Sequence, residues 1–189
     1  FNLGLEMQLR EAGIPTMHFV SPQIWAWRGG RIKKIKKAVS HMLVIFPFEE
    51  EIYKQAGVPV TYVGHPLAEM IPMAPDTAAA RRALGIPEAA RVVTVMPGSR
   101  MGELKYLAAP FVAAVSLLAR RDPALRFVVP MAGERQRQYF TQLVREAGLS
   151  DVQIDLVDGQ SHTAIAAADA VLVASGTATL EVALFKKPM

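Results

Sequence analysis

The stretch Val92-Val-Thr-Val-Met96, which runs directly into Pro97-Gly-Ser-Arg100, decides the fold of this chain. Five mostly β-branched or apolar residues are typical of a buried parallel strand. A helical pattern follows, so Gly98, Ser99 and Arg100 are predicted at a helix N-terminus beyond the carboxyl end of that strand. Unpaired backbone N–H groups and the helix dipole attract anions there, and the guanidinium of Arg100 matches phosphate oxygens. The stretch therefore indicates a ligand that carries phosphate.

Strands and helices alternate along most of the chain. Strands are predicted at 16–20, 42–46, 60–63, 92–95, 127–129, 152–154 and 170–173, with helical patterns between them. This order predicts right-handed βαβ units and parallel sheets, whose ligands bind beyond the carboxyl ends of the strands. Segment 64–75 interrupts the order with three prolines, which block helices and strand pairing. We therefore predict an α/β chain with domains at 1–63 and 76–189 and a linker at 64–75.

Three loops of the second half follow predicted strands, at 97–100, 130–133 and 174–179. In the third loop Gly176 lets a diphosphate approach the backbone amides, and Ser175, Thr177 and Thr179 supply hydroxyl donors. Glu181 follows one turn into the next helix, where it can accept hydrogen bonds from a ribose diol. Each loop alone has a simpler interpretation as a tight turn with a helix cap. Their joint place at one sheet edge favours a nucleotide diphosphate site.

Composition and absent motifs argue against several other classes of function. The chain has 189 residues, 51% of them hydrophobic and 20% charged, and no cysteine, which fits a soluble protein of a reducing cytoplasm. It contains no apolar run of about 18 residues and no secretory leader, and neither a P-loop nor a Gly-x-Gly-x-x-Gly fingerprint. No Asp-x-Asp pair is present, and the histidines at 18, 41, 65 and 162 lack metal-ligand spacing. We therefore expect neither a metal nor a cofactor.

Positive charge is concentrated near the beginning of the chain. The net charge is +4, and residues 1–40 carry seven Lys or Arg and two Glu, or +5, so that the remaining residues sum to −1. Such a local patch does not indicate a nucleic-acid-binding protein. The basic segment from Arg28 to Lys37 has a solvated helix face as its simple interpretation. Because Trp25 and Trp27 precede it, we favour an anionic membrane surface or an acidic lipid head group as its partner.

Four segments, in this order along the chain, resemble one bacterial family. They are Ser21-Pro-Gln-Ile-Trp-Ala-Trp-Arg28, Val63-Gly-His-Pro66, Met96-Pro-Gly-Ser-Arg100 with Glu103, and Ala174-Ser-Gly-Thr-Ala-Thr-Leu-Glu181. Together they closely resemble the lipid-A-disaccharide synthases, from end to end of the chain. The resemblance implies a hexosyltransferase with two Rossmann-like domains of glycosyltransferase-B type, both incomplete here. The implied inverting reaction of lipid A biosynthesis joins UDP-2,3-diacylglucosamine to 2,3-diacylglucosamine 1-phosphate, giving the lipid A disaccharide and UDP.

The resemblance also implies where substrates and partners bind. The donor nucleotide would lie on the second domain, against Gly98, Ser99, Arg100, Ser175, Gly176, Thr177, Thr179 and Glu181. The acceptor and the acyl chains would lie on the first domain, near Asn2, Ser21, Gln23, Trp25, Trp27 and Arg28. Phe1-Asn2 resembles the end of a motif that holds the proposed catalytic aspartate, so we expect the base upstream of Phe1 and a fragment that is inactive by itself. We expect a cytoplasmic protein peripherally associated with the inner membrane, with a homodimer as an open alternative to a monomer.

Two other functions stay open from the sequence. One is another UDP-sugar enzyme of the same architecture, such as a hexosamine transferase or a 2-epimerase, although a 2-epimerase would need neither the Trp25–Trp27 loop nor the basic helix. The other is a non-catalytic lipid-binding module that kept the scaffold. Intact Arg100 and Glu181 argue against such a module.

Overall fold

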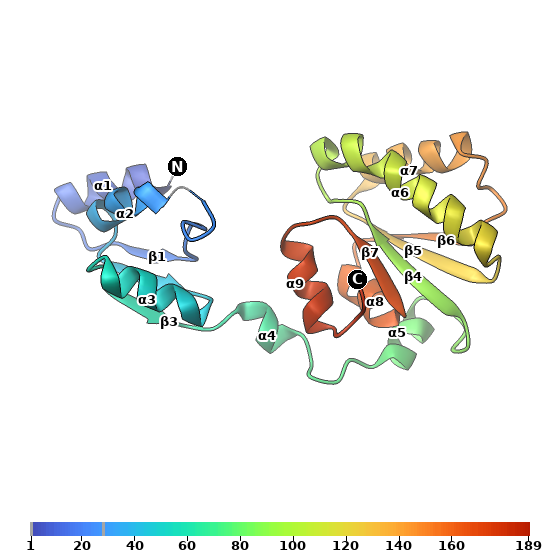
Figure 1. Cartoon of the computed structure of the whole chain (residues 1–189), viewed down its shortest axis with the longest axis horizontal. Helices are drawn as coiled ribbons and strands as arrows, with labels where there is room; N and C mark the ends of the chain where they lie inside the picture. Colours follow the sequence, from blue (N-terminus) through green and yellow to red (C-terminus); the bar gives the residue numbers. More distant parts are fainter. Residues whose placement is uncertain (1, 28) are drawn as a thin grey trace. The chain divides into compact units, whose positions relative to one another are not determined.

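The computed structural model describes residues 2–27 and 29–189, and the chain divides into two compact units (Figure 1). The first unit ends at Met70 and the second begins at Ile71, inside the proline-rich segment 64–75. Each unit holds one sheet, and every strand pairing in both sheets is parallel. The α/β class that the alternation of strands and helices predicts is therefore confirmed.

The first unit is built around a three-stranded sheet. Its strands are β1 (Met17–Phe19), β2 (His41–Val44) and β3 (Val60–Tyr62), in the order β1-β2-β3. Its helices are α1 (Asn2–Glu11), α2 (Ile32–Ala38), α3 (Pro47–Gln55) and α4 (Pro66–Met70), and a 3-10 turn (Gly29–Arg31) leads into α2.

One hydrophobic core joins three helices of the first unit to its sheet. The members come from α1, α2, α3 and the central strand β2, and they include Leu3, Ile35, Met42, Val44 and Tyr53. Side chains alternate across a strand, so Met42 and Val44 face the same side of the sheet. Because residues of α1, α2 and α3 pack against this pair, all three helices cover the same face.

The second unit is built around a four-stranded sheet in the order β6-β5-β4-β7. Its strands are β4 (Arg91–Met96), β5 (Leu125–Met131), β6 (Ile154–Asp158) and β7 (Ala170–Val173). Its helices are α5 (Thr77–Ala83), α6 (Met101–Arg121), α7 (Glu134–Glu146), α8 (Ser161–Ala167) and α9 (Thr177–Leu184). Helices α6 and α7 cover one face of the sheet, and α5 and α8 cover the other (Figure 1).

The central strand β4 supplies side chains to both faces, as the hydrophobic run at 92–96 predicts. Val95 packs with α6 and α7, whereas Val92 packs with α8 on the opposite side. Thr94 also faces α8 and is fully buried, and its hydroxyl donates to the carbonyl of Ala164 at 2.7 Å. The buried hydroxyl is therefore satisfied, and it ties β4 to α8.

Two details differ from the sequence prediction. The last-but-one strand is not at 152–154 but at Ile154–Asp158, because the N–H of Val152 donates to the carbonyl of Leu149 in a turn. Segment 64–75, a predicted linker whose three prolines are expected to block helices, contains the short helix α4. Pro66 begins this helix, where its missing N–H costs nothing, and His65 Nδ1 accepts from the N–H of Leu67 at 3.1 Å.

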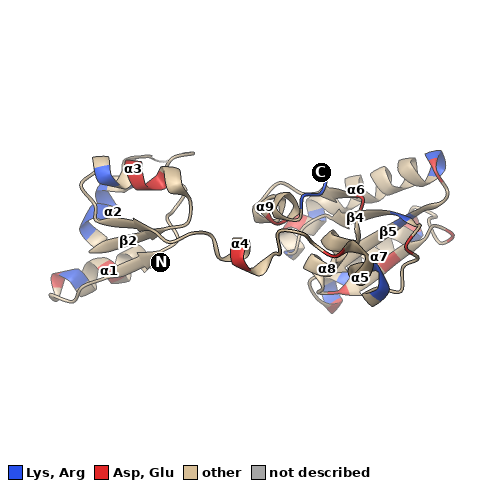
Figure 2. Ribbon diagram, turned by 90° about the horizontal axis from the view of Figure 1, so that it is seen from below, with Lys and Arg blue, Asp and Glu red and all other residues tan. Residues whose placement is uncertain are grey.

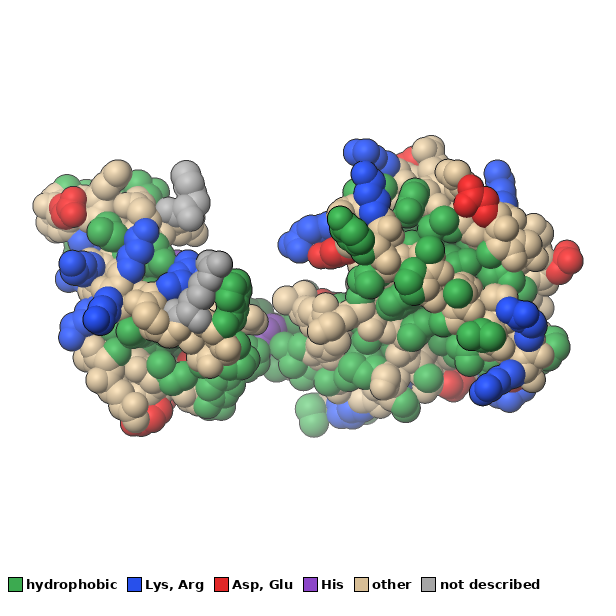
Figure 3. Space-filling model, turned by 45° about the horizontal axis from the view of Figure 1, so that its top comes forward, with side chains coloured by type: hydrophobic (Ala, Val, Ile, Leu, Met, Phe, Trp, Pro, Cys, Tyr) green, Lys and Arg blue, Asp and Glu red, His purple; other side chains and the backbone are tan. Residues whose placement is uncertain are grey.

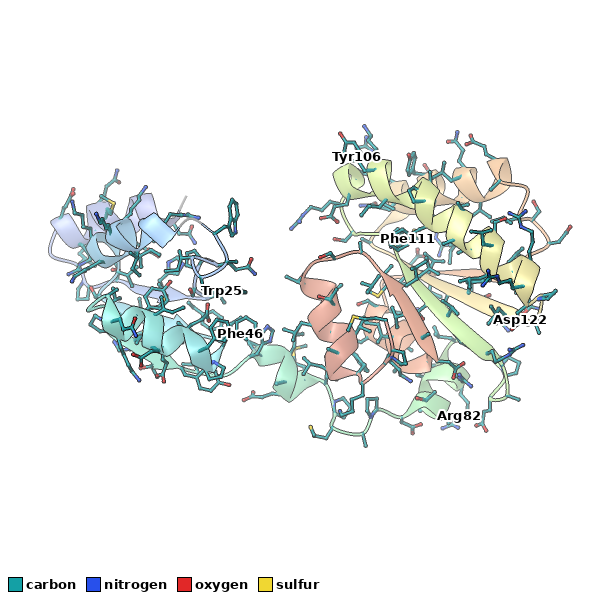
Figure 4. The ribbon with its side chains drawn as sticks, in the orientation of Figure 1. Trp25, Phe46, Arg82, Tyr106, Phe111 and Asp122 are labelled. Carbon is teal, nitrogen blue, oxygen red and sulfur yellow. The ribbon has the colours of Figure 1, made fainter. Side chains whose placement is uncertain are left out.

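Among the described helices, α6 is long and apolar enough by length and composition to cross a membrane, although the sequence shows no continuous apolar run of that length. One side of α6 belongs to the core, with Leu104, Ala108 and Val112 buried against the sheet. Tyr106 points away from the sheet and is exposed (Figure 4). The helix is therefore an amphipathic covering layer of an α/β unit.

Candidate functional site

The loops after β4 and β7 leave the same edge of the second sheet side by side. In the parallel register Met96 pairs with Val173, and the N–H of Ala174 donates to the carbonyl of Met96 at 2.9 Å. The bends at Gly98 and Gly176 therefore follow neighbouring strands at their carboxyl ends. This edge is where ligands of open parallel sheets bind. The structure thus brings together two of the three loops from which the sequence predicts a nucleotide site.

The N-terminus of α6 carries its own anion. The carboxylate oxygen Oε2 of Glu103 accepts from the N–H groups of Ser99 and Arg100 at 3.1 and 3.2 Å. The backbone bond from Arg100, and then the bond from Ser99, hold the pKa of the Glu103 carboxyl below its ordinary value. The prediction that these two N–H groups are unpaired is therefore wrong. An acidic residue at the third helical position is the sequence signal for this capping arrangement.

The capping carboxylate also contacts the side chain of Arg100. Oε1 of Glu103 binds Nη1 of Arg100 at 3.1 Å, while the Arg100 side chain remains 84% exposed. A guanidinium has five N–H donors, so one contact to Glu103 leaves donors for a second anion. Ser99 is also exposed, and its carbonyl accepts from Nε2 of Gln136 in α7 at 3.1 Å. The sequence gives no signal for Gln136, which ties this loop to the start of the next helix.

The loop between β7 and α9 offers small and polar groups to solvent. Ser175, Gly176 and Thr177 are exposed. Thr179, predicted as a hydroxyl donor to the ligand, instead donates to the carbonyl of Gly176 at 2.6 Å. In this structure its hydroxyl proton stabilises the first turn of α9. The groups that face solvent at this loop are therefore the hydroxyls of Ser175 and Thr177 and the nearby backbone.

Glu181 lies in α9 and contacts a residue that the sequence does not connect with it. Its Oε2 lies 3.1 Å from Nε2 of His162 in α8. The His162 ring also packs on Phe185, with ring centroids 5.4 Å apart. The carboxylate that the sequence predicts for a ribose diol is therefore held from a neighbouring helix.

In the first unit, aromatic side chains gather at the carboxyl ends of the strands. The ring of Trp25, from the loop after β1, meets Phe48 edge to face at 5.2 Å. Phe46, which follows β2, stacks on Phe48 at 5.7 Å, and Figure 4 labels Trp25 and Phe46. Trp25 and Phe48 are nearly half exposed, at 46% and 48%. This aromatic cluster of Trp25, Phe46 and Phe48 is an apolar surface of the kind that accommodates hydrocarbon.

The remaining predicted acceptor residues have different environments. Asn2, Gln23 and Trp27 are exposed, and Arg28 lies outside the described residues. Ser21 is buried, and its hydroxyl shares a 2.7 Å hydrogen bond with the hydroxyl of Tyr53 in α3. Burial raises the pKa of the Tyr53 phenol above its ordinary value, so the phenol stays neutral. Ser21 therefore anchors the loop that carries the tryptophans.

The backbone before this loop is strained. Val20, immediately after β1, has a φ of 71°, and its N–H donates to the carbonyl of Leu43 at 3.1 Å. A β-branched residue in this left-handed region is unfavourable, by about 1–3 kcal/mol. Such strain persists where the surrounding structure determines the backbone, and it clusters at functional sites.

Helix α2 presents a basic surface. Its lysines Lys33, Lys34, Lys36 and Lys37 are exposed, while Ile35 and Ala38 are buried in the core. Lys and Arg positions recur along the ribbon of α2 (Figure 2), and Lys and Arg side chains gather on one face of the first unit (Figure 3). Within residues 2–27 and 29–189, no cluster of three or more His, Cys, Asp or Glu side chains could hold a metal ion.

Solved structures share this fold. The UDP-GlcNAc 2-epimerase from Methanocaldococcus jannaschii matches with a TM-score of 0.59 and 11% identity, covering 98% of this chain and 56% of that one. A glycosyltransferase from Rickettsia africae matches with a TM-score of 0.52 and 12% identity, covering 98% and 60%. At such identities the likeness shows the fold alone. It confirms the predicted class, an α/β protein with Rossmann-like units of glycosyltransferase-B type.

Within that class the chain belongs to the lipid-A-disaccharide synthetase family, which it matches over residues 1–189. The lipid-A-disaccharide synthase of Cupriavidus pinatubonensis is 57% identical over 189 residues, covering all of this chain and 46% of the relative. That of Bordetella avium is 57% identical over 197 residues, covering all of this chain and 50% of the relative. The chain thus spans about half the length of the curated relatives it matches.

Proposed function

We propose that this chain is part of an inverting hexosyltransferase that joins UDP-2,3-diacylglucosamine to 2,3-diacylglucosamine 1-phosphate, releasing UDP and the lipid A disaccharide. Membership of the lipid-A-disaccharide synthetase family supports this reaction. The observation that carries it is the register of β4 and β7, which brings the loops at Gly98 and Gly176 to one sheet edge. In this proposal residues 76–189 belong to the donor domain and residues 1–63 to the acceptor domain, with 64–75 as the linker.

The donor site is proposed at that edge of the second sheet. The residues are Gly98, Ser99, Arg100, Ser175, Gly176, Thr177, Thr179 and Glu181. A diphosphate placed there meets the exposed Arg100 guanidinium from one loop and the exposed hydroxyls of Ser175 and Thr177 from the other. The N-terminus of α9 adds a favourable dipole. Thr179 contributes through the turn that its hydroxyl stabilises.

The proposed mechanism is a direct displacement at the anomeric carbon. A general base, proposed to lie before Phe1 in the full protein, removes the proton from the acceptor hydroxyl. The acceptor oxygen attacks, and the bond to the departing UDP oxygen breaks as negative charge grows on the diphosphate. Arg100 would stabilise that charge more strongly in the transition state than in the bound substrate, which is the condition for a rate effect.

The acceptor and its acyl chains are proposed on the first unit, at the aromatic cluster and the loop of Asn2, Ser21, Gln23, Trp25, Trp27 and Arg28. Apolar rings at the carboxyl ends of the strands support this placement. The exposed lysines of α2 support contact with the anionic surface of the inner membrane from the cytoplasmic side. In vesicle sedimentation, Lys33→Gln/Lys37→Gln should weaken binding to anionic but not to neutral phospholipid. Equal binding of the variant and the wild type to anionic vesicles would count against this contact.

The reaction is tested by turnover of the full-length protein. Arg100→Ala should lower kcat at least tenfold, which corresponds to an activation free energy raised by roughly 1.4 kcal/mol. Arg121→Ala is the matched control, because Arg121 is an exposed arginine at the other end of α6. Unchanged steady-state kinetics in Arg100→Ala would refute the role of the guanidinium. Turnover of UDP-N-acetylglucosamine with no turnover of the diacylated donor would refute the proposed reaction itself.

A further inference from the structure

His162 and Glu181 form a contact that no step above uses. Nε2 of His162 lies 3.1 Å from Oε2 of Glu181, and the two side chains are 37% and 22% exposed. His162 is in the first turn of α8, after β6, whereas Glu181 is in α9, after β7. The contact therefore links two helices that begin at the carboxyl edge of the sheet.

The geometry fixes one end of the carboxylate and leaves the other end available. His162 binds Oε2, and the contacts among the described residues place no partner on Oε1 of Glu181. The imidazole itself is fixed from its other side, because its ring packs on the buried ring of Phe185 with centroids 5.4 Å apart and planes inclined by 60°. A side chain held at one oxygen loses less rotational freedom when its second oxygen accepts a hydrogen bond from a ligand.

Neither partner of this contact caps its own helix. Glu181 is the fifth residue of α9, beyond the positions whose N–H groups need a capping acceptor. Partly exposed ion pairs contribute little to folding stability, about 0–1 kcal/mol. Stability therefore gives a weak reason for the contact, and orientation of the carboxylate gives a stronger one.

We propose that His162 is a positioning residue that orients the Glu181 carboxylate for the ribose hydroxyls of the donor nucleotide. The inference rests on the proposed function, because it needs the donor at this edge. His162 does not touch the reacting atoms. Its effect is on donor binding, so its loss should raise KM for the donor and leave kcat nearly unchanged.

The test compares two nucleotides on the full-length protein. Isothermal titration calorimetry with UDP and with 2′,3′-dideoxy-UDP separates contacts to the ribose hydroxyls from all others. His162→Ala should lower the affinity for UDP about fivefold to tenfold, which is the effect of one net hydrogen bond. It should lower the affinity for the dideoxy nucleotide less than about twofold. His162→Gln retains an N–H donor on a side chain of similar reach and should restore most of the affinity for UDP.

Each outcome bears on one claim. If His162→Ala weakens the binding of both nucleotides equally, His162 has a purely structural role and the inference is overturned. The inference is also overturned if the variant weakens the binding of neither nucleotide. Glu181→Ala separates this failure from that of the proposed site. If Glu181→Ala discriminates between the nucleotides and His162→Ala does not, the inference alone fails. If Glu181→Ala leaves UDP affinity unchanged, the proposed ribose contact fails, and the inference fails with it.

Discussion

Gly98→Ala, which adds a single methyl group, should strongly disturb the proposed donor edge. The φ of Gly98 is +120°, a backbone conformation that side chains with a Cβ rarely adopt. A Cβ built there lies 2.8 Å from Cβ of Glu103 and 2.9 Å from its Oε2. The Cβ of Glu103 is fixed to the backbone of α6, so it has little freedom to move away. Gly98→Ala should therefore force the cap off the N–H groups of Ser99 and Arg100.

The magnitude follows from the backbone. Placing a residue with a Cβ at this φ costs about 1–2 kcal/mol, and the overlap with Glu103 adds to that cost. We therefore expect the local stability to fall by about 2 kcal/mol or more. Hydrogen exchange of the amides of β4 and of the first turns of α6, followed by mass spectrometry on the full-length protein, measures this loss. Exchange should accelerate about 30-fold for 2 kcal/mol. UDP affinity should fall as well, because Ser99 and Arg100 lose their fixed position.

Gly102→Ala is the matched control, four residues away in the same structure. A Cβ at Gly102 meets no atom within 4 Å, and the residue is inside α6. Alanine is a better helix former than glycine, so this variant should be stabilised, by about 0.5 kcal/mol. If the amides of the Gly98→Ala variant exchange at the wild-type rate, this explanation of the turn is wrong. It is also wrong if exchange accelerates more in Gly102→Ala than in Gly98→Ala.

Two further predictions concern stability. Arg81→Met should destabilise the second unit by about 2–4 kcal/mol in urea unfolding, because the buried Arg81 guanidinium donates to the carbonyls of Ala167 and Glu88 and to both oxygens of Asp169. The variant of its exposed neighbour, Arg82→Met, should differ from wild type by less than about 0.5 kcal/mol. Equal effects of the two substitutions would refute the stabilising role of the Arg81 contacts. The Glu103 carboxyl has a folded pKa below its ordinary value of 4.5, so its contribution to stability is fully present above about pH 4.5 and is lost as the pH falls through the lowered folded pKa. Acid unfolding of Glu103→Gln should lack this component, and identical acid profiles would show that the cap contributes nothing.

The fold could be predicted well where burial is uniform. The run at 92–96 packs against helices on both faces of the sheet, and its strand is found at Arg91–Met96. The strand β6 was harder to place because it lies at the edge of the sheet and carries charges. Asp155 in β6 bonds Arg126 of the neighbouring strand at 2.5 Å, a pairing that only the register reveals. From the sequence alone, a carboxylate such as that of Asp155 favours a loop over a strand. Its partner on the neighbouring strand, which makes the strand favourable, is visible only in the structure.

The sequence likewise predicts one part of the candidate site and not the other. The position of the loops at Gly98 and Gly176 follows from the order of strands and turns, which the sequence contains. The direction of the side chains does not follow from it. Glu103 turns back onto the chain, and Glu181 meets His162 from another helix, because the crossing of α8 and α9 depends on how the whole unit packs. Local patterns indicate which residues reach the edge, and tertiary packing decides which atoms remain available there.

The pairing of Met96 with Val173 has a consequence for how such a protein can change over evolution. Main-chain hydrogen bonds join β4 directly to β7, although the chain makes a long excursion through α6, β5, α7, β6 and α8 between them. Insertions or deletions in the turns at the opposite end of that excursion leave this junction in place. The turns near 122–124 and 147–153 can therefore change in length while the two bends keep their spacing, although the core residue Leu149 limits which side chains the second turn can carry.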